Sequence, residues 1–329
     1  MDFLTLDPDD FVYGRSAEVA PQVRRVIAEN PSKFTYRGTG PDVVGRGDVG
    51  VVDPGPSLDS HRDALAAALS GDTVRAILIT HCHADHSPLS AWLAAETGAP
   101  TLAYGPHGDE SVDIGSLPDD FGRPPPTDDP AADDGPAAEA AAGGGSGDGT
   151  DAGASAEPPT EERTDTDFVP DESVRTGDVV ATGNGWQMTA LHTPGHTSNH
   201  TCFALDDGDV RTLFTGDHVM GWSTTVVSPP DGDMGAYMTS LREVAGRHDD
   251  VAIPTHGPPI PEPDRYVEQL IAHRLERECQ VLAAVRDGVT SIPDIVSLLY
   301  ADVRVELHRP AGNSVLAHHS KLTDDGAIE

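Results

Sequence analysis

Residues 81–86 read His-Cys-His-Ala-Asp-His and directly follow a short apolar run that is typical of a buried strand. Three histidines and an aspartate within six residues cost stability unless they bind something. On an extended loop, His81 and His83 project to the same side and could hold one cation. Asp85 and His86 turn toward a second position as the next helix begins. Such donors suit zinc, and manganese or iron would fit them too, so the hexapeptide predicts a metal site.

Three more strand-like runs end in a residue of the same kind. His196 lies in a TPGHT turn after WQMTAL, Asp217 ends RTLFTGD, and His256 ends VAIPTHG. Together with the run before His81, four separate strands deliver a ligand-type side chain on the loop at one end. If the matching ends of these strands are aligned in one fold, the loops converge on one rim. Four such loops favour one shared centre over four unrelated structural residues.

The motifs HCHADH, TPGHT, TGD and THG, in this order, resemble the metallo-β-lactamase superfamily over roughly residues 30–260. The resemblance implies an α+β fold, a four-layer αββα sandwich with the metals at the edge between two sheets. It also implies two Zn²⁺ ions per chain, because the chain retains the aspartate of the dinuclear members. The ligands would be His81, His83 and His196 for the first ion, Asp85, His86 and His256 for the second, and Asp217 as the bridge.

Two metal ions predict hydrolytic chemistry. Cations about 3.5–4 Å apart would lower the pKa of a bridging water far below about 15.7 and supply hydroxide near neutral pH. That hydroxide would attack a carbonyl carbon or a phosphorus atom. Asp85 is the natural carboxylate to orient the water and shuttle its proton, so we expect it to be the catalytic residue as well as a ligand.

Three residues near the ligands are candidates for supporting roles. Asp53, in VVDPGP, matches the family motif whose aspartate orients the ligand histidines; a turn carboxylate before Pro54 is the alternative reading. His200 in HTSNH and His218 in GDHVMGW are candidates for contacts with the ligands or with substrate. Cys82 points away from its histidine neighbours, so we expect it to be buried and not to bind metal.

Short β-rich runs and helical patterns over 58–69 and 88–97 surround these motifs and favour a layered arrangement. Residues from about 109 to 178 break the pattern: they hold 20 acids and three arginines, which is −17 of the net charge of −34, and few large apolar side chains. Such a segment buries too little apolar surface to offset its ordering entropy. We therefore predict a disordered acidic insertion over about 109–170.

The character of the chain changes after Pro263. Apolar residues at helical spacing, Leu275 among them, predict a long helix, and two shorter helices follow over 291–300 and about 313–322. This tail resembles the winged-helix-like C-terminal domain of the subgroup that includes lactamase-β-like endoribonucleases and many bacterial hydrolases. The subgroup usually has a GTNTY-like stretch where this chain reads Gly38-Thr-Gly, so the resemblance does not transfer a substrate preference.

We expect a catalytic domain over 1–262 and a small helical domain over 263–329. The helical domain would be a packing module, and it could also form a homodimer. Its charge bears on its partners: residues 262–329 hold 12 acids and seven Lys or Arg, a net charge of −5. A helix that binds duplex nucleic acid normally presents a basic face.

The charge balance of the whole chain, 55 acids against 21 Lys and Arg, would repel nucleic acid and anionic membranes. We therefore predict a hydrolase whose partner is a small-molecule ester, thioester or lactone. A single-strand-specific endoribonuclease or phosphodiesterase is the alternative that the subgroup favours. A non-enzymatic metal-bearing binding or redox module is a third hypothesis.

The start of the chain, MDFLTLDPDD, has neither a positive region nor a long apolar run, and three cysteines make no disulfide framework. We expect a cytoplasmic protein with no membrane partner. β-Lactam hydrolysis is not expected, because it would require export. The acidic, lysine-poor composition would suit a salt-rich cytoplasm; a GC-rich genome is the other explanation.

Overall fold

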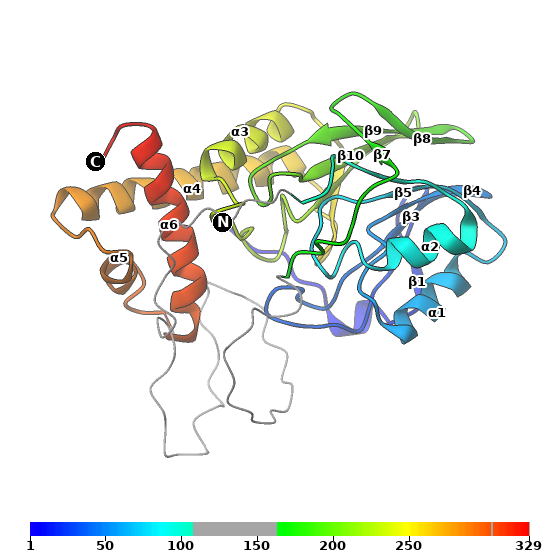
Figure 1. The fold of residues 1–329 in the computed structure, drawn as a ribbon, viewed down its shortest axis with the longest axis horizontal. Helices are drawn as coiled ribbons and strands as arrows, with labels where there is room; N and C mark the ends of the chain where they lie inside the picture. Colours follow the sequence, from blue (N-terminus) through cyan, green and yellow to red (C-terminus); the bar gives the residue numbers. More distant parts are fainter. Residues whose placement is uncertain (108–162, 304, 329) are drawn as a thin grey trace, which may run out of the picture.

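The computed structural model describes residues 1–107, 163–303 and 305–328. Two β-sheets pack face to face, helices cover the outer face of each, and a helical unit extends from one end of this sandwich (Figure 1). A short 3-10 helix, η1 (Pro8–Asp10), precedes the first strand. The predicted four-layer α+β sandwich with a C-terminal helical domain is confirmed.

The first sheet has, within the described residues, seven strands in chain order: β1 (Ser16–Ala20), β2 (Val23–Val26), β3 (Asp42–Arg46), β4 (Asp48–Val52), β5 (Thr73–Leu78), β6 (Thr101–Ala103) and β7 (Glu172–Ser173). Strands β1 to β4 pair antiparallel, whereas β4 to β7 pair parallel. Parallel neighbours need crossovers, and α1 (Asp59–Ala68) and α2 (Leu89–Thr97) provide the first two of them. Gly98 ends α2 in the left-handed conformation.

The second sheet has five strands in the described part, in the order β12 (Val251–Pro254), β11 (Arg211–Gly216), β10 (Thr201–Asp206), β9 (Trp186–His192) and β8 (Val179–Gly183). Strands β8 to β11 form an antiparallel meander. Strand β12 instead runs parallel to β11, because α3 (Met234–Ala245) carries the chain back across the sheet. The side chain of Asp233 caps α3 by accepting from the Ala236 amide.

Both faces of each sheet are covered, which explains the apolar runs in the sequence. In β10, Phe203 and Leu205 lie in the core between the sheets, whereas Cys202 and Ala204 pack toward the helices on the outer face. A separate apolar cluster joins α1 and α2 to the first sheet. The alternation along one strand therefore places the inner and outer layers of the sandwich.

Helix α4 (Pro263–Arg286) runs through two cores. Its first half contributes Tyr266, Val267 and Leu270 to the core beside α3, and its second half contributes Val281 and Ala284 to a core of its own. The second core also contains the remaining helical elements, α5 (Ile292–Leu299) and α6 (His308–Asp324), with the 3-10 turn η3 (Val305–Leu307) between them. None of the described helices is long and apolar enough to cross a membrane.

Most of the predicted insertion over 109–170 lies outside the described residues. Its final part, from residue 163, is placed in the structure: the amide of Asp165 donates to the carbonyl of Cys82, and Ser87 Oγ donates to the Asp165 carboxylate at 2.6 Å. Phe168 is buried in the core beside α2. The prediction of disorder is therefore wrong for residues 163–170, because they pack against the loop that follows β5.

Candidate metal centre

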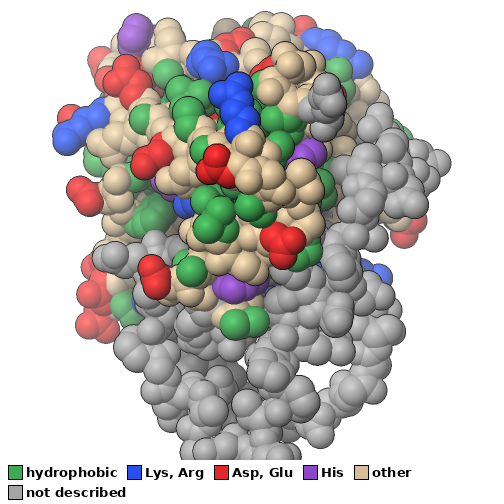
Figure 2. Space-filling view, turned by 90° about the vertical axis from the view of Figure 1, so that its left-hand side faces the viewer, with side chains coloured by type: hydrophobic (Ala, Val, Ile, Leu, Met, Phe, Trp, Pro, Cys, Tyr) green, Lys and Arg blue, Asp and Glu red, His purple; other side chains and the backbone are tan. Residues whose placement is uncertain are grey.

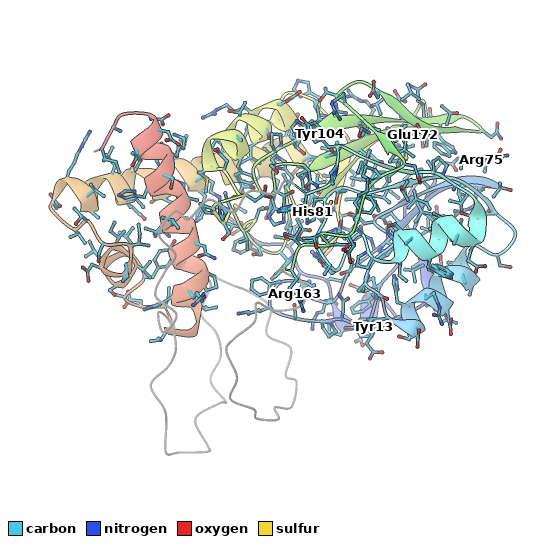
Figure 3. All side chains as sticks on the ribbon, viewed as in Figure 1. Tyr13, Arg75, His81, Tyr104, Arg163 and Glu172 are labelled. Carbon is cyan, nitrogen blue, oxygen red and sulfur yellow. The ribbon has the colours of Figure 1, made fainter. Side chains whose placement is uncertain are left out.

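The seven predicted ligands meet where strands of both sheets end, on the loops after β5, β9, β11 and β12 (Figure 3 labels His81). Their donor atoms form overlapping groups within 4.8 Å: His81, His83 and His196; His81, His86 and Asp217; Asp85, His86 and His256. All of them except His83 are buried. Four loops thus converge, as the sequence predicts: one follows a strand of the first sheet, and three follow strands of the second.

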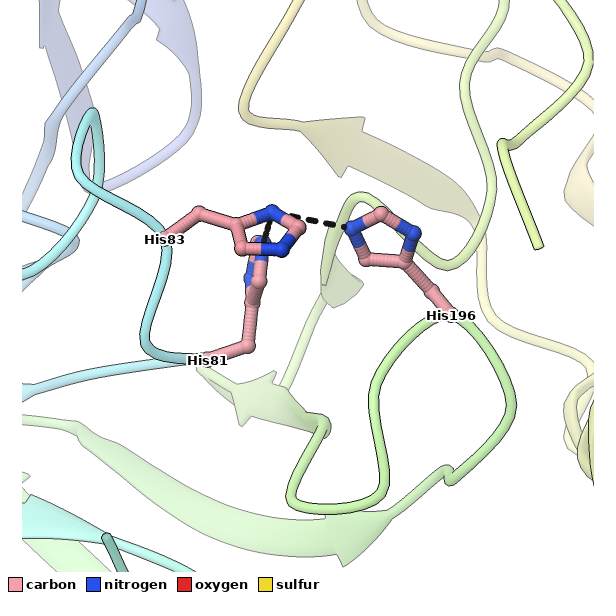
Figure 4. A group of neighbouring side chains, drawn as sticks. All are labelled: His81, His83 and His196. Atoms are coloured by element: carbon pink, nitrogen blue, oxygen red, sulfur yellow. Dashed lines mark hydrogen bonds between the residues drawn. The ribbon is translucent and has the colours of Figure 1, made fainter. Parts of the chain in front are cut away.

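The first group directs three ring nitrogens toward one point (Figure 4). His83 Nδ1 is 3.0 Å from His81 Nε2 and 3.3 Å from His196 Nε2. Nitrogens bound to one tetrahedral zinc at about 2.0–2.1 Å would be about 3.3–3.4 Å apart. Burial lowers the pKa of all three rings. They are therefore neutral at physiological pH and can offer lone pairs to a cation.

The group of Asp85, His86 and His256, called the second group from here on, places two histidines beside a carboxylate. His256 Nε2 is 3.1 Å and His86 Nε2 is 3.5 Å from Asp85 Oδ2. The His86 nitrogen is buried and has no hydrogen-bond partner among the described residues. Although burial disfavours a charged ring, the carboxylates of Asp85, Asp217 and Asp53 raise the pKa of His86 to about 10. This position attracts positive charge, as a metal-binding position must.

Asp217 lies between the two groups. Its Oδ2 faces His196 Nε2 at 3.9 Å, and its Oδ1 is 3.5 Å from His256 Nε2 and 3.7 Å from His86 Nε2. Oδ1 is buried without a hydrogen-bond partner among the described residues. One carboxylate that turns one oxygen to each group has the geometry of a bridging ligand, and the unpaired oxygen fits a cation there.

Backbone carbonyls orient two of the ligand rings. His196 Nδ1 lies 2.6 Å from the carbonyl oxygen of Val226, and His256 Nδ1 lies 3.3 Å from that of Gly38. A carbonyl only accepts, so each Nδ1 carries the proton and each Nε2 is left with a lone pair directed into the centre. The tautomer that binds metal is therefore fixed by the fold.

Asp53 orients other ligand rings and is only 1% exposed. Its Oδ1 accepts from the Thr80 amide, and its Oδ2 accepts from Thr80 Oγ1, His86 Nδ1 and Thr255 Oγ1 at 2.7–2.9 Å. Because the Thr80 hydroxyl donates to Asp53, it can accept from His81 Nδ1, which is 3.0 Å away. Asp53 thus supports two ligand histidines and is not a solvated turn carboxylate.

The two other candidates for supporting roles, His200 and His218, differ in their contacts. His200 Nε2 accepts from the amide of Asp217 at 3.3 Å, and its Nδ1 donates to Thr193 Oγ1, so it supports a ligand from behind. The ring of His218 is buried against Tyr237 and His200, and neither of its nitrogens has a hydrogen-bond partner among the described residues. Burial lowers the pKa of His218 to about 3. Its ring is therefore a neutral packing group.

Cys82 behaves as expected. Its side chain is fully buried in the core beside α2, and its Sγ accepts from Asn199 Nδ2 at 2.9 Å. Burial raises the pKa of this thiol to about 12. Cys82 therefore stays protonated, and within the described part of the chain it belongs to none of the groups that could hold a metal.

Two residues that were not predicted from the sequence also support the centre. Thr39 Oγ1 donates to Asp85 Oδ2 at 3.0 Å. Arg25, on β2, forms a buried two-pronged pair with Asp42 and also donates to the carbonyls of Pro254 and Gly257, on either side of the ligand His256. Thr39 lies in the Gly38-Thr-Gly stretch that departs from the subgroup pattern, but no local pattern predicts the contact of either residue.

Comparison with known proteins agrees with this architecture. The family described as "Metallo-beta-lactamase superfamily" matches residues 43–256, and "Beta-lactamase associated winged helix domain" matches residues 291–329. A beta-lactamase domain protein from Burkholderia ambifaria has a similar structure, with a TM-score of 0.67, 20% identity, and coverage of 96% of this chain and 91% of that one.

Two relatives match over almost the whole chain. An atrochrysone carboxyl ACP thioesterase of Paecilomyces divaricatus is 26% identical over 94% of this chain and 82% of its own length. A beta-lactamase-like protein 2 homolog of Caenorhabditis elegans is 26% identical over 95% of this chain and 88% of its own. The chain belongs to the metallo-beta-lactamase superfamily and is a hydrolase of that fold with a C-terminal winged helix domain.

Proposed function

We propose that this hydrolase holds two zinc ions and cleaves small acyl thioesters. The observation that carries the proposal is Asp217, whose two oxygens face two different groups of ligand-type residues. Two zinc ions held there would supply a hydroxide nucleophile near neutral pH and polarise the substrate carbonyl. The reaction would break the C–S bond, so that the acyl carbon gains the hydroxyl and the sulfur leaves as a thiol.

The chain's own residues would prepare this reaction. Asp85 would orient the attacking water and receive its proton, because its carboxylate lies beside His256 and His86 and is held by Thr39. The carbonyls of Val226 and Gly38 keep the ligand rings in the required tautomer. A rigid set of donors of this kind costs little reorganisation when charge develops on the substrate.

The choice of a thioester rests on the relatives and on charge. Several relatives that match about nine-tenths of the chain are named thioesterases. The C-terminal end of the molecule intersperses acidic, hydrophobic and a few basic side chains (Figure 2), which does not favour a nucleic-acid backbone. Single-stranded RNA is therefore the competing substrate that the experiment has to exclude.

The test is a panel of substrates with metal content measured on the same sample. We expect about two zinc ions per chain and the release of thiol from an acyl N-acetylcysteamine thioester, detected with a chromogenic thiol reagent. A lactone and a labelled single-stranded oligoribonucleotide run in parallel, in low and in high salt. Chelation and His81→Ala should abolish the activity, whereas His319→Ala, on α6, should leave it unchanged.

The outcomes separate the alternatives. Cleavage of the oligoribonucleotide that is lost in His81→Ala, without thioester cleavage, would replace the proposed substrate while keeping the metal centre. Thioester cleavage that survives complete removal of metal would overturn the centre itself.

A further inference from the structure

We propose that Arg274, on α4, is a positioning residue of the metal centre. It holds the turn at Thr225 and Val226, from which the ligands His196 and Asp217 are oriented. The inference rests on the metal centre of the proposed function but not on the identity of the substrate.

Arg274 is a buried cation with unusual partners. The residue is 3% exposed, one terminal nitrogen of its side chain donates to the carbonyl of Thr225, and the other lies 3.4 Å from Ser314 Oγ on α6. The guanidinium also lies over the ring of Tyr237, 5.4 Å from its centroid. Arg274 therefore touches the catalytic sandwich and the C-terminal helical unit at once.

Among the described carboxylates, none comes within 4.0 Å of the Arg274 guanidinium. Glu278, one turn further along α4, is instead paired with Lys321 at 3.1 Å. Burying a charge without an opposite charge is costly, and an apolar side chain of similar size would avoid that cost. The place of Arg274 is therefore better explained by the carbonyl that it holds than by stability alone.

The turn that Arg274 holds is connected directly to two ligands. Thr225 Oγ1 lies 2.8 Å from the carbonyl oxygen of Asp217 and 3.0 Å from that of His218, to which it can donate. The next carbonyl along the chain, that of Val226, accepts from His196 Nδ1 at 2.6 Å. The Thr225 carbonyl and the Val226 amide belong to one planar peptide unit, so holding this carbonyl fixes the unit that leads into Val226 and limits where the Val226 carbonyl, the acceptor for His196, can lie.

The contact between Arg274 and the ring of Tyr237 also stabilises the loop that follows Asp217. Tyr237 presents its ring face to the guanidinium, and its hydroxyl donates to the carbonyl of His218 at 2.9 Å. The residue after the ligand Asp217 is thus held from α3, while Thr225 is held from α4. Loss of the guanidinium would release one of these two attachments and let the turn relax away from His196.

The experiment measures zinc affinity by competition with a chromophoric chelator. Arg274→Met removes the charge and keeps the length, and we expect about 10-fold weaker binding at the His196 position, the lower end of the range for partners of ligand residues. Arg274→Lys should recover part of the loss, because an ammonium can still reach one carbonyl. The matched control is Arg277→Met, since Arg277 lies on the same helix but contacts Tyr300 and Gln280; its affinity should not change.

A second readout excludes a merely structural role. Cobalt substituted for zinc reports its ligand geometry through its visible absorption, and we expect an altered spectrum in Arg274→Met but not in Arg277→Met. Should Arg274→Met fail to fold, Thr225→Val decides the matter, because it breaks the link to Asp217 and leaves the helix intact. It should show the same direction of change in affinity and spectrum.

Unchanged zinc affinity and an unchanged cobalt spectrum in the folded Arg274→Met protein, or in Thr225→Val if that variant has to decide, would overturn the inference. Failure of the wild-type protein to bind zinc would instead overturn the proposed metal centre, so the two failures are distinguishable.

Discussion

Thr39 Oγ1 donates a hydrogen bond to Asp85 Oδ2 over 3.0 Å, although 46 positions separate the two residues. Asn30 holds Thr39 in turn, because its Nδ2 donates to Thr39 Oγ1 and its Oδ1 accepts from the Thr39 amide. Thr39→Val keeps the shape of the side chain but removes the donor. We therefore expect the metal affinity of the group formed by Asp85, His86 and His256 to fall by about 10-fold to 100-fold. Thr39→Ser keeps the hydroxyl and is the control. Equal affinities in all three proteins, measured by chelator competition, would contradict this role.

Asp217 should decide whether the centre holds one metal or two. Asp217→Ala removes both oxygens that face the two groups, so we expect the metal content to fall from about two ions per chain to one or fewer and kcat to fall by about 100-fold or more. Elemental analysis after gel filtration measures the first quantity, and thiol release measures the second. Retention of both metals in Asp217→Ala would show that this residue is not a bridge.

Gly195 lies next to the ligand His196 and packs against α3. Its φ is +142°, and a Cβ there would lie 2.3 Å from Tyr237 Cα, which is backbone and cannot move aside alone. We expect Gly195→Ala to lower the free energy of unfolding by about 2–5 kcal/mol, from backbone strain and overpacking together. Gly208→Ala shares the strain, with φ +87°, but has open space around it, so its smaller cost in urea unfolding isolates the clash.

Arg25 and Asp42 form a pair with about 5% exposure on each side chain. Arg25→Met should destabilise the protein by about 3–5 kcal/mol, because a carboxylate stays buried without its partner. Arg25→Met combined with Asp42→Leu should recover part of that stability. Neither variant keeps the contacts with the carbonyls of Pro254 and Gly257, so zinc affinity should stay lowered in both. Affinity that recovers together with stability would disprove the separate role.

His273 on α4 should make stability depend on pH. Burial, with help from Arg274 and Arg277, lowers the pKa of His273 to about 4, whereas an unfolded histidine titrates near about 6.5. Between these two pKa values His273 binds a proton in the unfolded state but not in the folded state. The stability that the neutral His273 ring contributes is therefore fully present above the unfolded pKa and is lost as pH falls toward 4. The slope is at most about 1.4 kcal/mol per pH unit. His273→Gln should lose less stability than wild type between pH 7 and pH 5 in urea unfolding; an identical loss would contradict this prediction.

The sequence predicts which donor side chains come together, because each follows an apolar strand in a short motif. Thr39 and Arg25 act through contacts with Asp85 and with the loop of His256, and such long-range contacts leave no local pattern. The hairpin of β1 and β2 was not predicted either, since β1 (Ser16–Ala20) is largely exposed and has no apolar alternation. The sequence therefore indicates the donors of the centre and, in Asp53, part of what holds them, but neither Thr39 nor Arg25.

Helical periodicity wrongly predicted which residues of α4 are buried near its middle. The apolar pattern predicts that Leu275 faces the core, but Leu275 is 41% exposed and its neighbour Arg274 is buried. A sequence pattern treats arginine as a surface residue, so it cannot find a buried guanidinium that binds a carbonyl. The last helix was also predicted to begin later, near residue 313; Pro310 lies in its first turn, where no amide donor is needed.

Helix α4 has a consequence for how the two domains unfold. It is continuous over 24 residues, or about 36 Å, and its two halves are anchored in two different cores. A hinge between the winged helix and the sandwich would have to break this helix or pull three large side chains out of the first core. Heat should therefore melt both parts in one cooperative transition, which calorimetry would record as a single peak.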